Sequence, residues 1–403
     1  MRSRLLLLPL TVSVLALASC ASTPPASTPS PADASADGHG AISGAQEVDE
    51  PPLHLATIAA DGTVSQLDLL SEQTSDIGAI DPPTALATDG RYLFADTADG
   101  VTIVDSGMWT WDHVDHFHYY RASPALLGTV PGEGAATVAT TNSSTTGGAG
   151  VYFAETGDAV LLDVAALSRG EIVESFRLRT DPHAGMVVPV GSFALVTDAD
   201  GTVSVHASDG DVVPGTRTAC PDPRGTITTR VGAVVGCDDG ALLASMQDGA
   251  VRIERIPLPE GAARPLSFAN REGRPTAAGL SSDGRILLLD TRERQWVELP
   301  APAPLVAVTA VDDADAHVVG LTADGRVVVI DGTSGTQLAI TEPLVAASLA
   351  RGDRPALIAD DRRTYLTGPA EHLLFEIDVA DGARIARTFT TSDEPLFVAE
   401  TGR

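Results

Sequence analysis

The stretches DGRILLLD (Asp283–Asp290) and DGRVVVID (Asp324–Asp331) decide the fold of this chain. Each begins with an Asp-Gly pair and continues as a run of Leu, Ile and Val that ends in Asp. An Asp-Gly pair between two apolar runs is the strongest short-range signal for a β-hairpin, because both turn residues tolerate positive φ. Each stretch therefore predicts a tight turn followed by a strand.

The same pattern recurs from about residue 50 to the C-terminus. It also occurs at Asp61-Gly62, Asp99-Gly100, Gly157-Asp158, Asp200-Gly201 and Asp239-Gly240, and in a degenerate form at Glu371-His372. Successive turns are roughly 38 to 59 residues apart, which is close to the length of a four-stranded propeller blade. Helical periodicity is nearly absent, except for one helical turn indicated at 164–169. We therefore predict an all-β chain with a single β-propeller over residues 51–403, of eight blades, or seven if the degenerate turn is miscounted.

The two ends of this region predict how the ring closes. The first turn follows the start of the body at Leu53 too soon for a whole blade to precede it. The C-terminal stretch PLFVAE (Pro395–Glu400) is strand-like and has no turn of its own. Pairing it into the first blade would bury both exposed edges, so we expect the C-terminal strand to close the ring.

The charge excludes one class of function. The chain has 54 acidic and 26 basic residues, a formal charge of −28, and its basic residues are all Arg. A nucleic-acid binder needs a basic face, which this composition does not offer. The acidity suits solubility in an extracytoplasmic space, with an acidic docking surface as the alternative. With 43% hydrophobic residues, the chain is globular rather than disordered.

The N-terminus predicts export. Arg2 and Arg4 precede an apolar run, Leu5–Ala18, which is typical of a secretory signal and too short to span a bilayer. The run ends in Leu-Ala-Ser followed by Cys20, which resembles the lipobox of bacterial lipoproteins. We expect a lipoprotein signal peptide at 1–19, a lipid on Cys20 and an anchor on the outer face of the cytoplasmic membrane. A plain signal peptide is the alternative. Residues 20–50 are rich in Ala, Ser, Thr and Pro and predict a flexible tether.

Two further cysteines, Cys220 and Cys237, remain in the body of the chain. An extracytoplasmic setting permits a disulfide between them, which would contribute roughly 3 kcal/mol in the chain-entropy model. Two buried free thiols are the alternative. Neither cysteine lies in a C-x-x-C motif, so redox catalysis and a thiolate metal site are poorly supported.

One segment, MWTWDHVDHFHYY (Met108–Tyr120), departs from the repeat and lies in the longest gap between turns. Neutral imidazoles suit zinc. A carboxylate can bind the ion itself, or it can orient a metal-binding histidine by accepting a hydrogen bond from its other ring nitrogen. The candidate ligands are His113, His116, His118, Asp112 and Asp115. His116 and His118 share one face of an extended chain and could reach one ion, whereas His113 would need a bend. A polar surface loop without metal is the alternative.

The aromatic residues of the same segment have two possible roles. Trp109, Trp111, Tyr119 and Tyr120 could anchor a partner protein beside the metal, or pack the segment against the propeller. His183, in DPHAG (Asp181–Gly185), lies at the start of a blade strand. It could complete the metal site from another blade, but composition alone favours a hydrogen-bonded structural histidine. No nucleophile elbow, zinc-protease motif, Walker loop or dinucleotide fingerprint is present.

Taken together, these motifs resemble a known family. The WT-x-DH-x-DH-x-HYY segment, the PHxG element (Pro182–Gly185), the single Cys pair and the terminal AETG (Ala399–Gly402) are similar to those of the AztD-type zinc metallochaperones. The resemblance implies a propeller that binds zinc outside the cytoplasm and hands it to the solute-binding protein of a zinc ABC transporter. It also implies zinc ligation by His113, His116 and His118, with His183 as a contributor.

The chain departs from this family in three respects, one of which is the lipobox, since the family is pictured as freely diffusing. The tether retains only His39, and Arg224 stands where a histidine is expected; both argue against a second zinc site. The leading hypothesis is a monomeric zinc carrier without catalytic turnover. A metal-dependent propeller hydrolase or lactonase, with Asp112 or Asp115 as the general base, is the competing class. A metal-free adaptor, with Trp109–Tyr120 as its docking epitope, is the third. Ligands clustered on one inserted segment favour the carrier.

Overall fold

The computed structural model describes residues 40–112, 116–141 and 147–403. Residues 1–39, which hold the predicted signal peptide, Cys20 and His39, lie outside these ranges. The described chain is nearly all β, as predicted. Its helices are α1 (Val164–Leu167), within the predicted helical turn, and α2 (Ala346–Arg351), which the sequence did not predict. No helix in the described ranges has the length and apolarity needed to cross a membrane.

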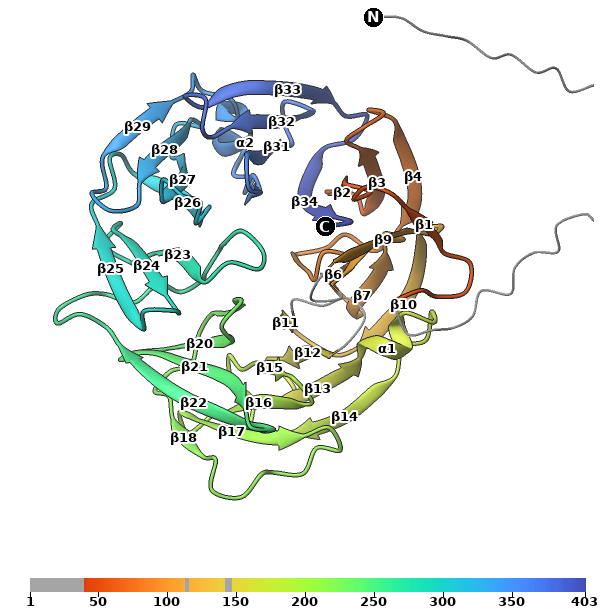
Figure 1. Ribbon diagram of the computed structural model, residues 1–403, viewed down its shortest axis with the longest axis vertical. Helices are drawn as coiled ribbons and strands as arrows, with labels where there is room; N and C mark the ends of the chain where they lie inside the picture. The colour runs from red at the N-terminus through yellow and green to blue at the C-terminus, as the bar shows by residue number, and fades with distance from the viewer. Residues whose placement is uncertain (1–39, 113–115, 142–146) are drawn as a thin grey trace, which may run out of the picture. The chain divides into compact units, whose positions relative to one another are not determined.

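The strands in the described ranges form nine sheets, eight of which follow one another around a ring (Figure 1). The first four ring sheets are β34 (Pro395–Thr401), β2 (His54–Ala59), β3 (Thr63–Asp68) and β4 (Thr74–Ala79); β5 (Ala85–Thr88), β6 (Tyr92–Thr97), β7 (Gly100–Asp105) and β10 (Ala125–Pro131); β11 (Ala136–Thr140), β12 (Gly148–Phe153), β13 (Asp158–Asp163) and β14 (Glu174–Arg179); and β15 (Val187–Val190), β16 (Phe193–Asp198), β17 (Thr202–Ala207) and β18 (Thr218–Ala219). The other four are β19 (Thr226–Thr228), β20 (Ala233–Cys237), β21 (Gly240–Gln247) and β22 (Ala250–Pro257); β23 (Thr276–Leu280), β24 (Ile286–Asp290) and β25 (Gln295–Leu299); β26 (Leu305–Ala310), β27 (His317–Thr322), β28 (Val327–Asp331) and β29 (Gln337–Ile340); and β30 (Leu357–Ala359), β31 (Arg363–Gly368), β32 (Leu373–Asp378) and β33 (Arg384–Thr390).

Each predicted turn joins two neighbouring strands of a ring sheet, which are the two central strands in every four-stranded ring sheet. Gly62 and Gly325 have φ angles of 90° and 88°, as expected for glycines in such turns. A Cβ atom on Gly62 would lie 1.9 Å from the carbonyl oxygen of Ile80, so the turn has no room for a side chain. The degenerate turn places His372 at φ 54°, in the same left-handed region. It is therefore a turn of the repeat.

The first and last strands pair as predicted. Strand β34 lies antiparallel to β2, with His54 opposite Thr401 and Ile58 opposite Phe397. Buried apolar clusters fill the spaces between neighbouring sheets. One of them joins Leu55, Leu67 and Val398 of the first sheet to Tyr365 and Leu374 of the eighth. The apolar burial that stabilises each neighbouring pair thus also closes the ring.

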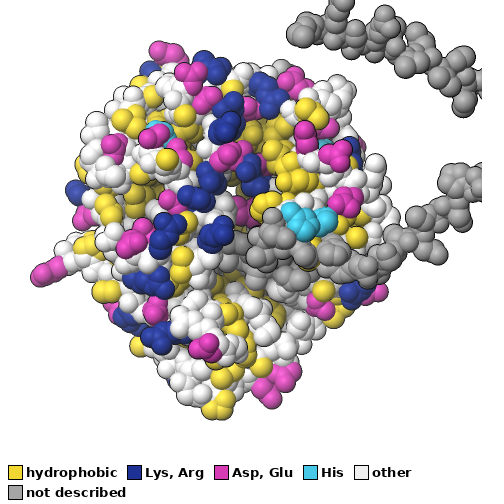
Figure 2. Space-filling view, viewed as in Figure 1, with side chains coloured by type: hydrophobic (Ala, Val, Ile, Leu, Met, Phe, Trp, Pro, Cys, Tyr) yellow, Lys and Arg dark blue, Asp and Glu magenta, His cyan; other side chains and the backbone are white. Residues whose placement is uncertain are grey.

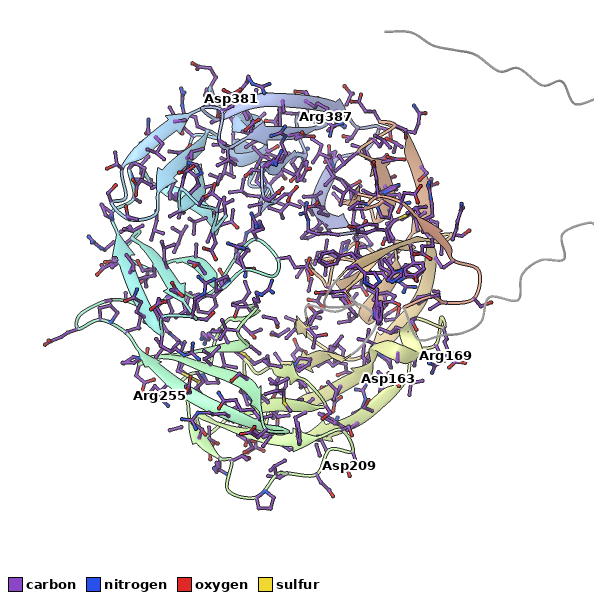
Figure 3. All side chains as sticks on the ribbon, viewed as in Figure 1. Asp163, Arg169, Asp209, Arg255, Asp381 and Arg387 are labelled. Atoms are coloured by element: carbon purple, nitrogen blue, oxygen red, sulfur yellow. A yellow bond between two sulfur atoms is a disulfide. The ribbon has the colours of Figure 1, made fainter. Side chains whose placement is uncertain are left out.

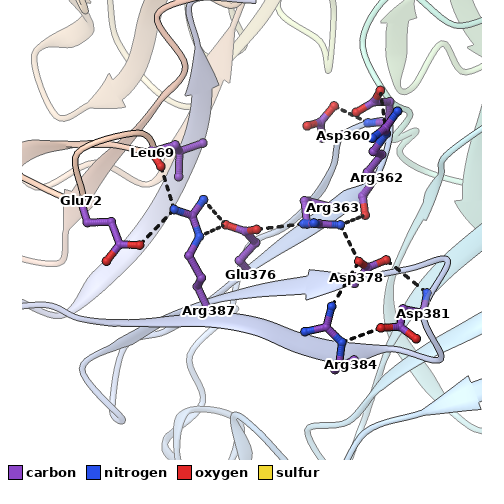
Figure 4. Close-up of polar contacts among 11 residues, drawn as sticks. Leu69, Glu72, Asp360, Arg362, Arg363, Glu376, Asp378, Asp381, Arg384 and Arg387 are labelled. Atoms are coloured by element: carbon purple, nitrogen blue, oxygen red, sulfur yellow. Dashed lines mark hydrogen bonds and ion pairs between the residues drawn. The ribbon is translucent and has the colours of Figure 1, made fainter.

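Ion pairs strengthen the same junction (Figure 4). Arg387 on β33 donates 2.7 Å hydrogen bonds to the carbonyl oxygen of Leu69 and to Glu376 Oε2, and lies 3.2 Å from Glu72 Oε1. Glu376, whose side chain is 5% exposed, also accepts a 2.9 Å hydrogen bond from Arg363 Nε. Since Leu69 and Glu72 lie in the turn after β3, these bonds tie the eighth sheet to the first. Other charged residues, including Asp209, Arg255 and Asp381, lie along the outer rim (Figure 3).

Cys220 and Cys237 form a disulfide, the pairing expected from the sequence. Cys220 directly follows β18 of the fourth sheet, and Cys237 ends β20 of the fifth. Both side chains are fully buried in the cluster between these sheets. The bridge therefore joins two neighbouring sheets of the ring.

The ninth sheet carries the histidine segment. It consists of β1 (Gln46–Val48), β9 (Phe117–Arg121) and β8 (Met108–Asp112), in the spatial order β1-β9-β8. Strands β8 and β9 form a hairpin that is inserted between β7 and β10 of the second ring sheet. The predicted tether was too long at its C-terminal end. Residues 46–48 belong to it in the prediction, but they are ordered as β1 by backbone pairing to β9.

Candidate metal centre

The hairpin is fixed to the propeller by its first tryptophan. Trp109 is fully buried and stacks on Tyr120, its partner across the strands, with ring centroids 5.3 Å apart. Trp109 also contacts Arg91, whose guanidinium lies 4.0 Å from the Trp109 ring centroid in a cation–π arrangement. Thr110 Oγ1 donates a 2.9 Å hydrogen bond to the carbonyl oxygen of Gly402, near the C-terminus. The hairpin therefore rests on a packed base.

Arg91 is itself held in place by a buried carboxylate. Its Nε and Nη2 donate to the two Asp105 carboxylate oxygens at 2.9 and 2.7 Å. Burial opposes the charge on Arg91, but these hydrogen bonds and the charge of Asp105 hold its pKa above the ordinary value. The cation above Trp109 is therefore permanent at physiological pH.

Two histidines meet at the end of this hairpin. The Nε2 atoms of His116 and His118 lie 2.9 Å apart, and their ring centroids lie 4.7 Å apart. His116 is exposed, whereas the side chain of His118 is 19% exposed. Figure 2 shows histidine side chains on this face of the ring, to the right of its centre. The two imidazoles predicted to reach one ion are thus brought together.

The hydrogen bonds of His118 fix which nitrogen can bind a metal. His118 Nδ1 lies 2.7 Å from Glu47 Oε1, and a carboxylate can only accept. Nδ1 therefore carries the proton of the neutral ring, and Nε2 presents its lone pair toward His116. In this arrangement His116 Nε2 donates to His118 Nε2. A metal ion between the rings would require His116 to present a lone pair there too.

The spacing of these nitrogens suits zinc. Two imidazole nitrogens at about 2.0–2.1 Å from one tetrahedral zinc ion lie about 3.3 Å apart. The 2.9 Å separation in the structure would have to open by only about 0.4 Å. A carboxylate behind the imidazole of His118 is the arrangement that orients metal-binding histidines in many proteins. The pair therefore fits zinc as two of its ligands.

Among the described residues, the structure does not place the other predicted ligands at this pair. His113 and Asp115 lie outside the described ranges. Asp112 is exposed at the end of β8, opposite Phe117. Within residues 40–112, 116–141 and 147–403, no three His, Cys, Asp or Glu side chains are gathered as a metal site. The described part of the centre is the pair His116 and His118.

His183 has other partners. Its Nδ1 lies 2.6 Å from the Tyr152 hydroxyl and 2.8 Å from the carbonyl oxygen of Asp181, and its Nε2 lies 2.9 Å from Thr197 Oγ1. Burial raises the pKa of Tyr152, so this hydroxyl stays protonated. These contacts on both ring nitrogens favour the structural role that composition indicated. The ligand role implied by the resemblance stays a prediction.

Two of the four predicted docking residues are buried. Trp109 and Tyr120 are 0% and 3% exposed, so they pack the hairpin and are not available as surface anchors. Trp111 and Tyr119 are half-buried and remain candidates for docking. Glu47 was missed by sequence reasoning. It pairs with His118 across 71 residues, and no motif or periodicity in the tether marks it.

Comparisons with known proteins agree with this fold. No family model matches the chain, and no curated protein sequence matches it. The crystal structure of AztD from Citrobacter koseri superposes with a TM-score of 0.73 at 21% identity, covering 87% of this chain and 98% of that chain. The chain has the fold of AztD. Apo AztD from the same organism gives a TM-score of 0.72 at 20% identity, with the same coverage.

The AztD likeness confirms the predicted β-propeller. Dihydro-heme d1 dehydrogenase NirN, in complex with DHE, also matches, with a TM-score of 0.55 at 16% identity over 88% of this chain and 76% of that chain. The AztD fold is therefore shared with an enzyme as well. Since one fold serves many activities, the function has to be argued from the site.

Proposed function

We propose that the protein is an extracytoplasmic zinc metallochaperone that delivers zinc to the solute-binding protein of a zinc ABC transporter. The observation that carries the proposal is the convergence of His116 Nε2 and His118 Nε2, with Glu47 behind His118. The AztD-type fold and the motifs that resemble this family support the same function. We keep His113 and one of Asp112 and Asp115 as the remaining ligands.

The position of the ligands favours a carrier over an enzyme. His116 and His118 belong to one inserted hairpin outside the eight ring sheets, together with the proposed His113 and Asp residues. A carrier has to surrender its ligands in steps, and movement of such a hairpin tip leaves the ring sheets intact. A catalytic zinc site would more often draw ligands from several blades. The half-buried Trp111 and Tyr119 lie beside the centre and are the proposed contacts for the acceptor.

The proposal includes a location. Residues 1–19 would direct export, and a lipid on Cys20 would anchor the chain to the outer face of the cytoplasmic membrane. The tether would then hold the propeller close to a membrane-bound transporter. This location is also where a disulfide such as Cys220–Cys237 persists.

The deciding experiment is direct transfer. Zinc-loaded protein is mixed with the metal-free solute-binding protein of a zinc ABC transporter, and zinc arrival is followed by the acceptor's fluorescence. A chelator that captures free zinc is present in half of the reactions. A metallochaperone should load the acceptor in both halves, at a rate that rises with acceptor concentration. If the chelator intercepts all of the zinc at every acceptor concentration, the delivery function is excluded.

A further inference from the structure

The N-terminal segment Gly40–Val48 lies against the histidine hairpin. The carbonyl oxygen of Gly40 accepts a 3.1 Å hydrogen bond from Trp109 Nε1. Gly40 also packs so tightly on Trp111 that a Cβ atom there would lie 2.5 Å from Trp111 Cγ. At the other end of the segment, β1 pairs with β9, and Glu47 stands opposite Tyr120. The segment is therefore attached to the hairpin at both of its ends.

Glu47 makes the contact that matters for the metal pair. Its Oε1 lies 2.7 Å from His118 Nδ1, on the side of the imidazole away from His116. Glu47 cannot reach the space between the two Nε2 atoms in this position, so it is not a ligand of an ion held there. What it does is set the tautomer and the direction of the His118 ring.

We infer that Glu47 is a positioning residue of the zinc centre, a role that rests on the proposed function. By accepting the Nδ1 proton, it keeps the lone pair of His118 Nε2 directed at His116. Without it, the His118 ring can adopt the other tautomer, in which Nε2 carries the proton and cannot bind an ion. Carboxylates that orient a metal-binding histidine in this way typically contribute 10–100-fold to metal affinity.

This role makes the centre depend on the chain N-terminal to the ring. Glu47 reaches His118 because β1 is paired to β9, and β1 has only three residues, two of them exposed. So short an edge strand is weakly held and can separate from β9 without disturbing the ring sheets. Separation of β1 would remove the carboxylate from His118 and lower zinc affinity.

The test compares Glu47→Ala with Glu50→Gln as the matched control. Glu50 lies in the same exposed segment, and its substitution removes the same charge three residues away. Glu47→Gln is the conservative variant, since its amide oxygen can still accept from Nδ1. The first measurement is long-range ¹H–¹⁵N NMR on metal-free protein, which reports which nitrogen of His118 carries the proton. The second is zinc affinity by competition with a chelator.

Wild type, Glu50→Gln and Glu47→Gln should hold the proton on His118 Nδ1, whereas Glu47→Ala should give a mixture of tautomers. Zinc should bind about 10–100-fold more weakly to Glu47→Ala than to the control. A His118 tautomer and zinc affinity that match the control would overturn the positioning role. Absence of zinc binding in wild type would instead defeat the proposed function, and the tautomer would still test the contact of Glu47 with His118.

Discussion

The Arg91 guanidinium covers the ring of Trp109 at 4.0 Å, and this contact seats the histidine hairpin on the second ring sheet. Arg91 lies in the turn between β5 and β6 of that sheet, and Trp109 lies on the inserted β8. Because Asp105 holds Arg91 through two charge-assisted hydrogen bonds, the base of the hairpin is fixed to the second ring sheet. This buried base therefore positions His116 and His118 near the end of the hairpin.

Trp109→Ala should therefore destabilise the protein strongly. Loss of a buried Trp costs about 3–5 kcal/mol of unfolding free energy, measured by urea denaturation. Trp111→Ala is the matched control, since Trp111 lies two residues further along the same strand and is half-buried. We expect a clearly smaller loss for Trp111→Ala. Equal losses for the two variants would contradict the assignment of Trp109 as the base of the hairpin.

A buried carboxyl near this base predicts a pH dependence. Asp89 is 6% exposed; its Oδ1 accepts from the backbone N–H groups of Arg91 and Tyr92, and its Oδ2 is buried with no partner among the described residues. Burial raises the pKa of Asp89 to about 6, although the two backbone N–H groups lower it. The folded protein therefore binds this proton more tightly than the unfolded chain does.

The direction of the pH effect on stability follows from the linkage between proton binding and folding. Since the folded pKa is raised, the contribution of Asp89 to stability falls as pH rises from about 4 to 6, by up to about 3 kcal/mol. Asp89→Asn stays neutral, so its stability relative to wild type should improve across this window. The measurement is urea unfolding at several pH values, with Asp99→Asn, an exposed turn residue, as control. A constant difference between Asp89→Asn and wild type would refute the prediction.

The disulfide leads to a prediction about the number of free thiols in the body of the chain. In a Cys20→Ala protein, the body cysteines Cys220 and Cys237 are the only ones left. Thiol titration of the unfolded, non-reduced protein should find neither of them free. Replacing both by Ala should lower the unfolding free energy by about 3 kcal/mol. Two reactive thiols in the unreduced protein would exclude the bridge.

Lipid anchoring is tested at Cys20. Cys20→Ala should move the protein from the membrane fraction to the soluble fraction, because the acyl chains have no attachment site. Ser19→Ala keeps a small residue before the cysteine and should stay with the membrane. The measurement is fractionation of expressing cells followed by detection of the protein in each fraction. Membrane association that persists in Cys20→Ala would show that the lipobox interpretation is wrong.

The repeat made most of the fold predictable from sequence. Asp-Gly turns are local signals, so the hairpin of each ring sheet could be placed without knowing its neighbours. Helix α2 was missed because it has six residues, no capping side chain at Val345 and no visible period. The sixth sheet also departs from the repeat. Its innermost strand is reduced to bridges from Pro265 and Ala269 to the β23 hairpin, which no sequence pattern indicates.

The site was less predictable, since its contacts cross long stretches of chain. The pairing of His116 and His118 follows from their spacing on an extended segment, which is a local property. Glu47 reaches His118 from 71 residues away, through a strand of three residues. His183 is held by Tyr152 from 31 residues away, so its occupied nitrogens could not be anticipated from the PHxG motif.

The last prediction separates the two histidine sites. His116→Ala/His118→Ala should abolish tight zinc binding, because it removes both converging Nε2 atoms. The ring should stay folded in this variant, since the pair lies on the inserted hairpin outside the ring sheets. His183→Ala should behave in the opposite way. It should leave zinc affinity close to wild type but lower the unfolding free energy by about 1–3 kcal/mol, because the Tyr152 hydroxyl and Thr197 Oγ1 lose a partner.

Both properties can be measured on the same preparations, zinc affinity by chelator competition and stability by urea unfolding of the metal-free proteins. His206→Ala is a suitable control, since His206 is a buried histidine in the fourth ring sheet that also hydrogen-bonds to the backbone, at Gly210. A large loss of zinc affinity in His183→Ala, without a matching loss in His206→Ala, would restore the ligand role that the family resemblance implied. Unchanged affinity in the double variant would remove the hairpin pair from the zinc centre.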